Sequence, residues 1–138
     1  IGTIRLEQNE HGVLMVTDLK DLGPGPHGFH LHENPDCGPA TKDDEPTPAG
    51  AAGGPYDPEN TGAHKGPFST DGHLGDLPRI HVGQEGESEQ TYLAPRLELN
   101  HFRGRAHVIH QGSDNYSDDP QPLGGGGARV ACGVVPES

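Results

Sequence analysis

The sequence has no tryptophan, one methionine, and few aromatic residues, which make up 4% of its 138 residues. Only 29% of the residues are apolar, whereas glycine and proline number 22 and 14. Such a composition excludes a large hydrophobic core and borders on that of disordered chains. We therefore expect residues 1–138 to form one domain that metal ligands or a disulfide help to close.

Cationic residues are also scarce, because 9 Lys and Arg face 21 Asp and Glu, for a net charge of −12 with neutral histidines. This charge argues against nucleic acid and anionic membrane surfaces as partners, and it opposes anionic substrates at long range. No apolar run approaches the roughly 18 residues of a membrane span, and no signal peptide heads the sequence. We expect a mature or shortened soluble protein without membrane insertion.

The chain has only two cysteines, Cys37 and Cys132. A disulfide between them would stabilise the folded state by about 4 to 5 kcal/mol, because it would reduce the conformational entropy of the unfolded chain. Two reduced, buried thiols are the alternative. An even count in a small chain with a poor core favours the bridge and hence an oxidising compartment.

Short alternating stretches predict strands, and nothing in the sequence predicts a helix or a repeat. Residues 1–8 and 11–19 form the expected first hairpin. Two long irregular loops, 34–78 and 111–127, separate the later strands, which indicates an antiparallel sandwich or barrel. The further strands are expected at 27–33, 79–83, 91–99, 104–110 and 128–135.

Two histidines lie two residues apart in the run GFHLHENPDC. On a strand, His30 and His32 point to one face about 7 Å apart, while Phe29 and Leu31 point to the other. Imidazole is a common ligand of copper and zinc, so this stretch offers half of a metal site with a core behind it. Taken alone, the pair favours the alternative, a half-buried strand with two solvated histidines.

The long loop carries His64, His73 and Asp76 within GAHKGPFSTDGHLGDLP. Two imidazoles and a carboxylate match a zinc set in kind and number. A polar surface loop is the alternative, since such residues are common in loops.

The stretch RAHVIH supplies one further candidate ligand, because His107 and His110 point to opposite faces of a strand and only one can join His30 and His32. Just after it, Asp114 can accept a hydrogen bond from the outer nitrogen of a ligating imidazole and fix its tautomer.

Six motifs occur together in one order: GFHLHENPDC, AAGGPYDP, TGAHKGP, GHLGDLP, VIH followed by GSDNYSD, and PLGGGGARVACGV. In this the sequence resembles copper/zinc superoxide dismutases of the bacterial periplasmic type, from about residue 1 to 135. The resemblance implies an all-β fold, a flattened eight-stranded Greek-key barrel with a zinc loop and an electrostatic loop, in the periplasm or another extracellular or cell-envelope location.

The resemblance also implies cofactors, a substrate and residue roles. The substrate would be the superoxide anion, and both a monomer and a homodimer remain open. Asp114 would link the two metal shells, Cys37 and Cys132 would form the disulfide, and Arg129 would guide superoxide to the copper. The copper ligands would be His30, His32 and His110, and the zinc ligands His64, His73 and Asp76.

The sequence departs from the family at three points. Pro55 stands where the family has the histidine that bridges copper and zinc, so each metal loses a ligand. The family's first strand has no counterpart here, which leaves the sequence shortened or a sheet edge open for a loop or a partner. His107 replaces an inward apolar residue, and we expect it to be buried and neutral. We interpret the remaining histidines as structural or surface residues, namely His11, His27, His81 and His101.

These departures predict a three-histidine copper site with a raised redox potential and weakened turnover. Three imidazoles can hold Cu(I), whereas Cu(II) prefers four tetragonal ligands. The predicted activity is the conversion of superoxide to oxygen and hydrogen peroxide. The alternative is a non-catalytic protein of the same fold that stores or delivers copper or zinc.

Overall fold

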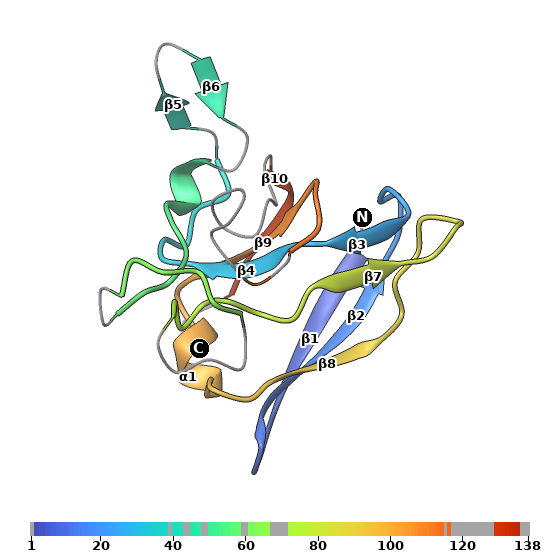
Figure 1. Ribbon diagram of the computed structural model, residues 1–138, viewed down its shortest axis with the longest axis horizontal. Coiled ribbons are helices and arrows are strands. Elements are labelled where there is room, and N and C mark those ends of the chain that lie inside the picture. The colour runs from blue at the N-terminus through green and yellow to red at the C-terminus, as the bar shows by residue number, and fades with distance from the viewer. Residues whose placement is uncertain are drawn as a thin grey trace.

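The computed structural model describes residues 2–38, 40–42, 45–47, 50–58, 61–66, 72–114, 116 and 129–135. Its strands form two three-stranded antiparallel sheets, β1-β2-β8 and β10-β9-β4, and two antiparallel two-stranded pairs, β3-β7 and β5-β6 (Figure 1). The strands are β1 Gly2–Asn9, β2 Gly12–Leu19, β3 Gly25–His27, β4 Phe29–His32, β5 Ala40–Lys42, β6 Glu45–Thr47, β7 Ile80–Val82, β8 Thr91–Ala94, β9 Ala106–His110 and β10 Arg129–Val134. The antiparallel all-β architecture agrees with the prediction.

The predicted first hairpin is present, with β1 and β2 paired from Gly2 opposite Leu19 to Asn9 opposite Gly12. On β2 the side chains of Val13 and Met15 are fully buried, whereas β1 is largely exposed. Gly12 has φ +134°, and a Cβ there would lie 2.3 Å from the carbonyl oxygen of Ala94. The turn therefore requires glycine at this position.

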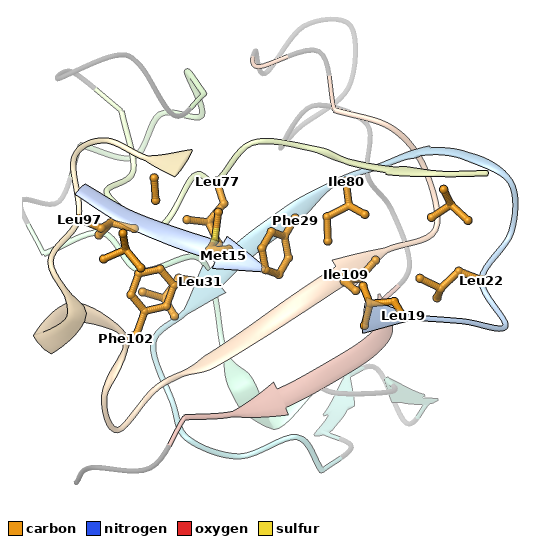
Figure 2. Packing of buried hydrophobic residues seen from close by; sticks show 13 residues of the cluster. Met15, Leu19, Leu22, Phe29, Leu31, Leu77, Ile80, Leu97, Phe102 and Ile109 are labelled. Atoms are coloured by element: carbon orange, nitrogen blue, oxygen red, sulfur yellow. The ribbon is translucent and has the colours of Figure 1, made fainter. Parts of the chain in front are cut away.

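The core lies between the two larger sheets and is small, as the composition predicts (Figure 2). Phe29 and Leu31 of β4 point into it and pair with Ile109 and His107 of β9. Because side chains alternate along a strand, His30 and His32 point to the opposite face of the same sheet. The core thus fixes the strand that presents the two histidines.

The structure corrects three predictions about the secondary structure. The expected strand 91–99 ends at Ala94, because Pro95 has no N–H for the ladder. A short helix α1, Leu99–Phe102, follows, and its first turn is closed by the Glu98 N–H, which donates to Nδ1 of His101 (2.9 Å). A 3₁₀ turn, η1 Gly50–Ala52, and the β5-β6 pair lie within the long loop.

The third correction concerns residues 27–33, which form parts of two strands rather than one. β3 pairs with β7, and β4 pairs with β9. The change of partner occurs at Gly28, whose N–H donates to the carbonyl of Gly112 (2.8 Å).

β1 and β10 are edge strands of the two larger sheets, with β8 and β4 at the opposite edges. A hollow between β1 and β10 is lined by Ile4, Leu19, Ile109 and His107, among others. Of the second predicted loop, residues 115 and 117–127 lie outside the described part of the chain. No helix among the described residues is long and apolar enough to cross a membrane.

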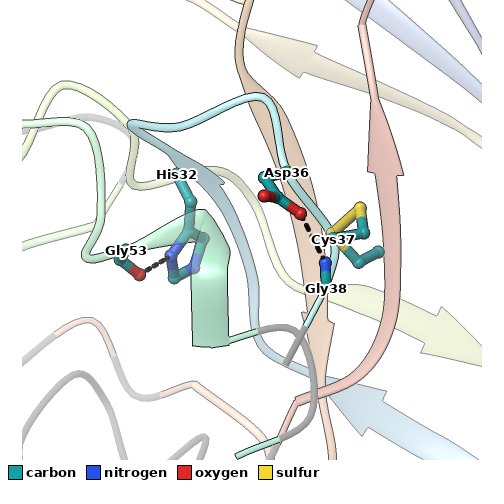
Figure 3. The surroundings of a disulfide bond; sticks show 6 residues. His32, Asp36, Cys37, Gly38 and Gly53 are labelled. Atoms are coloured by element: carbon teal, nitrogen blue, oxygen red, sulfur yellow. Dashed lines mark hydrogen bonds between the residues drawn. A yellow bond between two sulfur atoms is a disulfide. The ribbon is translucent and has the colours of Figure 1, made fainter. Parts of the chain in front are cut away.

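Cys37 and Cys132 form a disulfide, with their Cα atoms 5.7 Å apart (Figure 3). The bond ties the segment after β4 to β10. That segment also contacts η1, because the Asn34 N–H donates to the carbonyl of Ala52 (3.0 Å) and the Ala51 N–H donates to that of Gly38 (2.9 Å). The disulfide therefore anchors the loop that leads to Pro55.

Removing this disulfide should lower the free energy of unfolding by about 2 to 5 kcal/mol, because it closes a loop between residues 95 positions apart in a chain with a small core. Denaturant unfolding of the Cys37→Ala, Cys132→Ala double variant would measure the loss. Thiol titration of the native, unreduced protein is the control, and finding two free thiols there would contradict the assignment.

Candidate metal centre

Three histidine side chains converge on the outer face of the β10-β9-β4 sheet. His30 and His32 of β4 pair with Val108 and Ala106 of β9, which share a face with His110. Nδ1 of His30 lies 3.1 Å from Nε2 of His110. All three residues offer nitrogen atoms within 4.8 Å of one another, and all three are buried. His107 points to the core face instead and contacts the Phe29 ring (5.9 Å between centroids).

The orientations of the His30 and His32 rings are fixed by hydrogen bonds on the sides that face away from the cluster. Nδ1 of His32 donates to the carbonyl of Gly53 (2.8 Å; Figure 3), and Nε2 of His30 donates to Oδ2 of Asp114 (2.9 Å). His27 supports the third ring indirectly, because its Nδ1 lies 2.7 Å from the carbonyl oxygen of His110. Such partners fix the tautomers of His30 and His32 and turn the other ring nitrogen of each toward the cluster.

Nε2 of His32 is a buried nitrogen with no hydrogen-bond partner, the one such side-chain atom found among the described residues. Burial lowers the pKa of His32 to about 3, and the hydrogen bond to Gly53 only partly offsets this. The ring is therefore neutral at pH 7 and presents a lone pair to the cluster. A buried lone pair without a donor fits a metal ligand.

A second cluster lies beside the first and consists of His64, His73 and Asp76. Nδ1 of His64 is 2.9 Å and Nδ1 of His73 is 3.3 Å from the same oxygen, Oδ1 of Asp76. Burial opposes charge on His64, but its hydrogen bonds to Asp114 and Asp76 outweigh it and raise the pKa to about 9. Burial likewise opposes charge on Asp76, yet the hydrogen bonds from His64 and His73 lower its pKa to about 2. Two nitrogens and a carboxylate around one point form a donor set suited to zinc.

Asp114 joins the two clusters through its carboxylate. Oδ2 accepts from Nε2 of His30, and Oδ1 accepts from Nε2 of His64 (2.7 Å) and from the Tyr116 N–H (2.8 Å). Burial alone would raise the pKa of Asp114, but the hydrogen bonds from the two histidines hold it well below its usual range. The link between the clusters is therefore an ionised, buried carboxylate.

Pro55 pairs with His32 across an isolated antiparallel bridge. The Glu33 N–H donates to the carbonyl of Gly54 (3.1 Å), and the Tyr56 N–H donates to that of Leu31 (2.7 Å). Hydrogen bonds on both flanks make His32 and Pro55 a non-hydrogen-bonded pair, in which the side chains lie on the same face and close together. The position needs no N–H, so proline fits the backbone without losing a bond.

Arg129 lies at the start of β10, where the pairing with β9 shifts register between Arg129 and Ala131. Its Nη2 donates to the carbonyl of Gly53 (2.7 Å), the same oxygen that accepts from His32. The guanidinium is thus held beside the three-histidine cluster.

The predicted residues of both clusters lie together. His27, predicted to be structural or at the surface, is structural, because it is buried with both ring nitrogens facing carbonyl oxygens, those of His110 and Gly23. Arg79 and Arg96 donate to backbone carbonyls of the two clusters, which no sequence pattern indicated. His11 and His81 are exposed, as expected, and burial lowers the pKa of His107 to about 4, so that it is neutral.

The chain matches the family model for copper/zinc superoxide dismutase over residues 1–135. It is 52% identical over 135 residues to the Cu-Zn superoxide dismutase of Photobacterium leiognathi, a match that covers 98% of this chain and 78% of the relative. The solved structure of Cu/Zn superoxide dismutase from Brucella abortus is similar, with a TM-score of 0.95 and 49% identity over 98% of this chain and 88% of that one.

A more distant solved structure is also similar, with a TM-score of 0.76 and 28% identity over 99% of this chain and 89% of that one. It is a double mutant of a superoxide dismutase-like protein from Bacillus subtilis, in which a tyrosine and a proline are replaced by histidine. These likenesses confirm the Greek-key β-sandwich and the pair of metals, copper and zinc. The chain belongs to the copper/zinc superoxide dismutase family.

Proposed function

We propose that this member of the family is a superoxide dismutase with a three-histidine copper site and weakened turnover. His30, His32 and His110 would ligate copper, and His64, His73 and Asp76 would ligate zinc. Bound copper would supply the one-electron chemistry by which two superoxide anions and two protons yield oxygen and hydrogen peroxide.

The observation that carries the proposal is the pairing of Pro55 with His32, whose Nε2 is buried without a partner. A residue at position 55 shares a face with His32, so it lies where a fourth nitrogen could join the cluster. Proline has no side-chain donor or acceptor. A square-planar or tetragonal Cu(II) site therefore lacks one protein ligand, whereas three imidazoles suffice for Cu(I).

The loss of an imidazole at position 55 also removes a group that can carry a proton next to the reacting oxygen. Water must deliver the protons for peroxide formation in its place. We therefore expect slower turnover and weaker copper retention, with superoxide dismutation as the reaction.

Arg129 supports an anionic substrate rather than metal storage. Its charge lies beside the cluster in a chain of net charge −12, where an incoming anion otherwise meets repulsion. A fixed cation at the site can attract the anion at distances shorter than the Debye length, where salt screens the attraction only partly.

The disulfide supports a location in an oxidising compartment, the periplasm or another extracellular or cell-envelope site. The experiment that tests the proposed function is metal analysis combined with a dismutase assay on copper-loaded protein. Copper bound without dismutation would identify a metal-binding protein of the same fold instead.

Replacing Pro55 by histidine should tighten copper binding by more than about tenfold and raise the dismutation rate, because the new imidazole completes the ligand set without a change in backbone hydrogen bonding. Copper titrations and assays under identical loading would measure both effects. Pro55→Ala is the control, since it removes the ring but adds no ligand. Equal results for the two variants would show that position 55 does not face the copper.

Zinc affinity should increase with pH and level off near pH 9. In the metal-free protein His64 holds a proton with a pKa of about 9, and zinc must displace that proton from the ring. Below pH 9 the apparent affinity should therefore rise by about tenfold per pH unit from this proton alone. Competition titrations between pH 6.5 and 8.5 would check this, and a flat profile would contradict it.

Replacing Arg129 by methionine should slow dismutation by about tenfold at low salt and flatten its dependence on ionic strength. Arg129→Lys keeps the charge and should retain part of the salt dependence. Both are to be assayed in protein with equal copper content. An unchanged rate at low salt for Arg129→Met would show that the guanidinium does not steer the substrate.

A further inference from the structure

Arg79 makes an unusual contact for a cation in so acidic a chain. Its Nη1 donates to the backbone carbonyl of Asp114 (2.8 Å). Among ion pairs that join two described residues, only that of Arg5 with Glu7 links an arginine to a carboxylate. The guanidinium of Arg79 is therefore used to hold a loop backbone at the metal centre.

Tyr116 completes this contact from the other side. The Arg79 N–H donates to its hydroxyl oxygen (3.1 Å), and the Arg79 guanidinium lies 5.2 Å from its ring centroid. The Tyr116 N–H in turn donates to Oδ1 of Asp114. Tyr116 has φ 60°, and its ring packs on Gly66, where an added Cβ would lie 2.6 Å from the Tyr116 Cβ. The carbonyl and the carboxylate of Asp114 are thus both fixed by this pair.

Asp114 needs such an anchor because it lies beyond the sheet. β9 ends at His110, and the last backbone bond of this ladder joins Gly28 to Gly112. Two residues later, the carboxylate of Asp114 must reach His30 with one oxygen and His64 with the other. A small rotation of the loop would lengthen both hydrogen bonds.

We propose that Arg79 is a positioning residue that couples the two metal sites through Asp114. This inference rests on the ligand sets proposed above. With zinc held by His64, His73 and Asp76, the His64 ring would be fixed, and Asp114, which accepts from both His64 and His30, would hold the His30 ring in position for copper. Because Pro55 provides no second link between the sites, the coupling depends on the placement of Asp114.

Three variants separate this role from a general effect on stability. Arg79→Met removes the hydrogen bond to Asp114 and keeps a long apolar stem. Arg79→Lys retains a cation that can still donate to the Asp114 carbonyl but lacks the planar guanidinium group. Arg103→Met is the matched control, since Arg103 is exposed and its Nη1 donates to Asn100 (3.1 Å), away from both clusters.

The first measurement is the ratio of the copper dissociation constants without and with zinc. We expect a ratio of about tenfold in the present chain and in Arg103→Met, and of less than about twofold in Arg79→Met. Arg79→Lys should lie between them. A loss of stability alone would weaken both metals without changing this ratio.

The second measurement needs no metal. In the metal-free protein, NMR would follow the exchange of the Nε2 protons of His30 and His64, which Asp114 accepts. Their exchange should be at least about tenfold faster in Arg79→Met than in Arg103→Met.

The two measurements also separate this inference from the proposed function. If Arg79→Met matches Arg103→Met in both, Arg79 has no positioning role. If the present chain binds neither metal at these clusters, the ligand sets are wrong, and the proton exchange alone decides the role of Arg79. Should Arg79→Met fail to fold, Arg79→Lys is judged by the same two comparisons.

Discussion

The arrangement of both clusters depends on one buried carboxylate, that of Asp114. Removing a charge from water costs several kcal/mol unless partners replace the solvent. Here two imidazole N–H groups and a backbone N–H occupy the lone pairs of Asp114. A charge that is satisfied only in one geometry selects that geometry, so the need to solvate Asp114 keeps His30 and His64 in place.

Hydrogen bonds of this kind, together with the disulfide, compensate for the small number of apolar residues in the core. Phe29 and Leu31 hold one face of β4 against the core, and hydrogen bonds and the disulfide hold the other. Buried polar groups, which would destabilise an apolar core without partners, here hold the loops to the sheet by hydrogen bonds. The histidines of β4 lie on this polar side, so one short strand contributes both core residues and candidate metal ligands.

Much of this could be predicted from the sequence. The alternation in FHLH and AHVIH gave the faces of β4 and β9, including the separation of His110 from His107, because a strand fixes side-chain direction every two residues. The first hairpin followed from its pattern, and both clusters followed from spacing together with the family resemblance. Local chemistry was sufficient wherever the partners were neighbours on one strand or one loop.

The remainder depended on contacts between distant segments. His27 contacts the backbone carbonyl of His110, 83 positions away in the sequence, and Arg79 donates to that of Asp114, 35 positions away. Neither contact has a local pattern, since a backbone carbonyl accepts from any donor that reaches it. The end of β8 at Ala94 differs from the predicted strand for another reason, because the alternating pattern continues past Pro95, whose missing N–H ends the strand.

The backbone around Pro55 has a consequence for the history of the site. Because the hydrogen bonds of this bridge are made by its neighbours, proline and histidine are interchangeable there as far as the main chain is concerned. Proline codons that end in a pyrimidine differ from histidine codons by a single base. A lineage could lose the fourth imidazole in one mutational step, keep the fold and the disulfide, and regain the imidazole by the reverse step. Selection at this position would then act on the chemistry of the site and not on the fold.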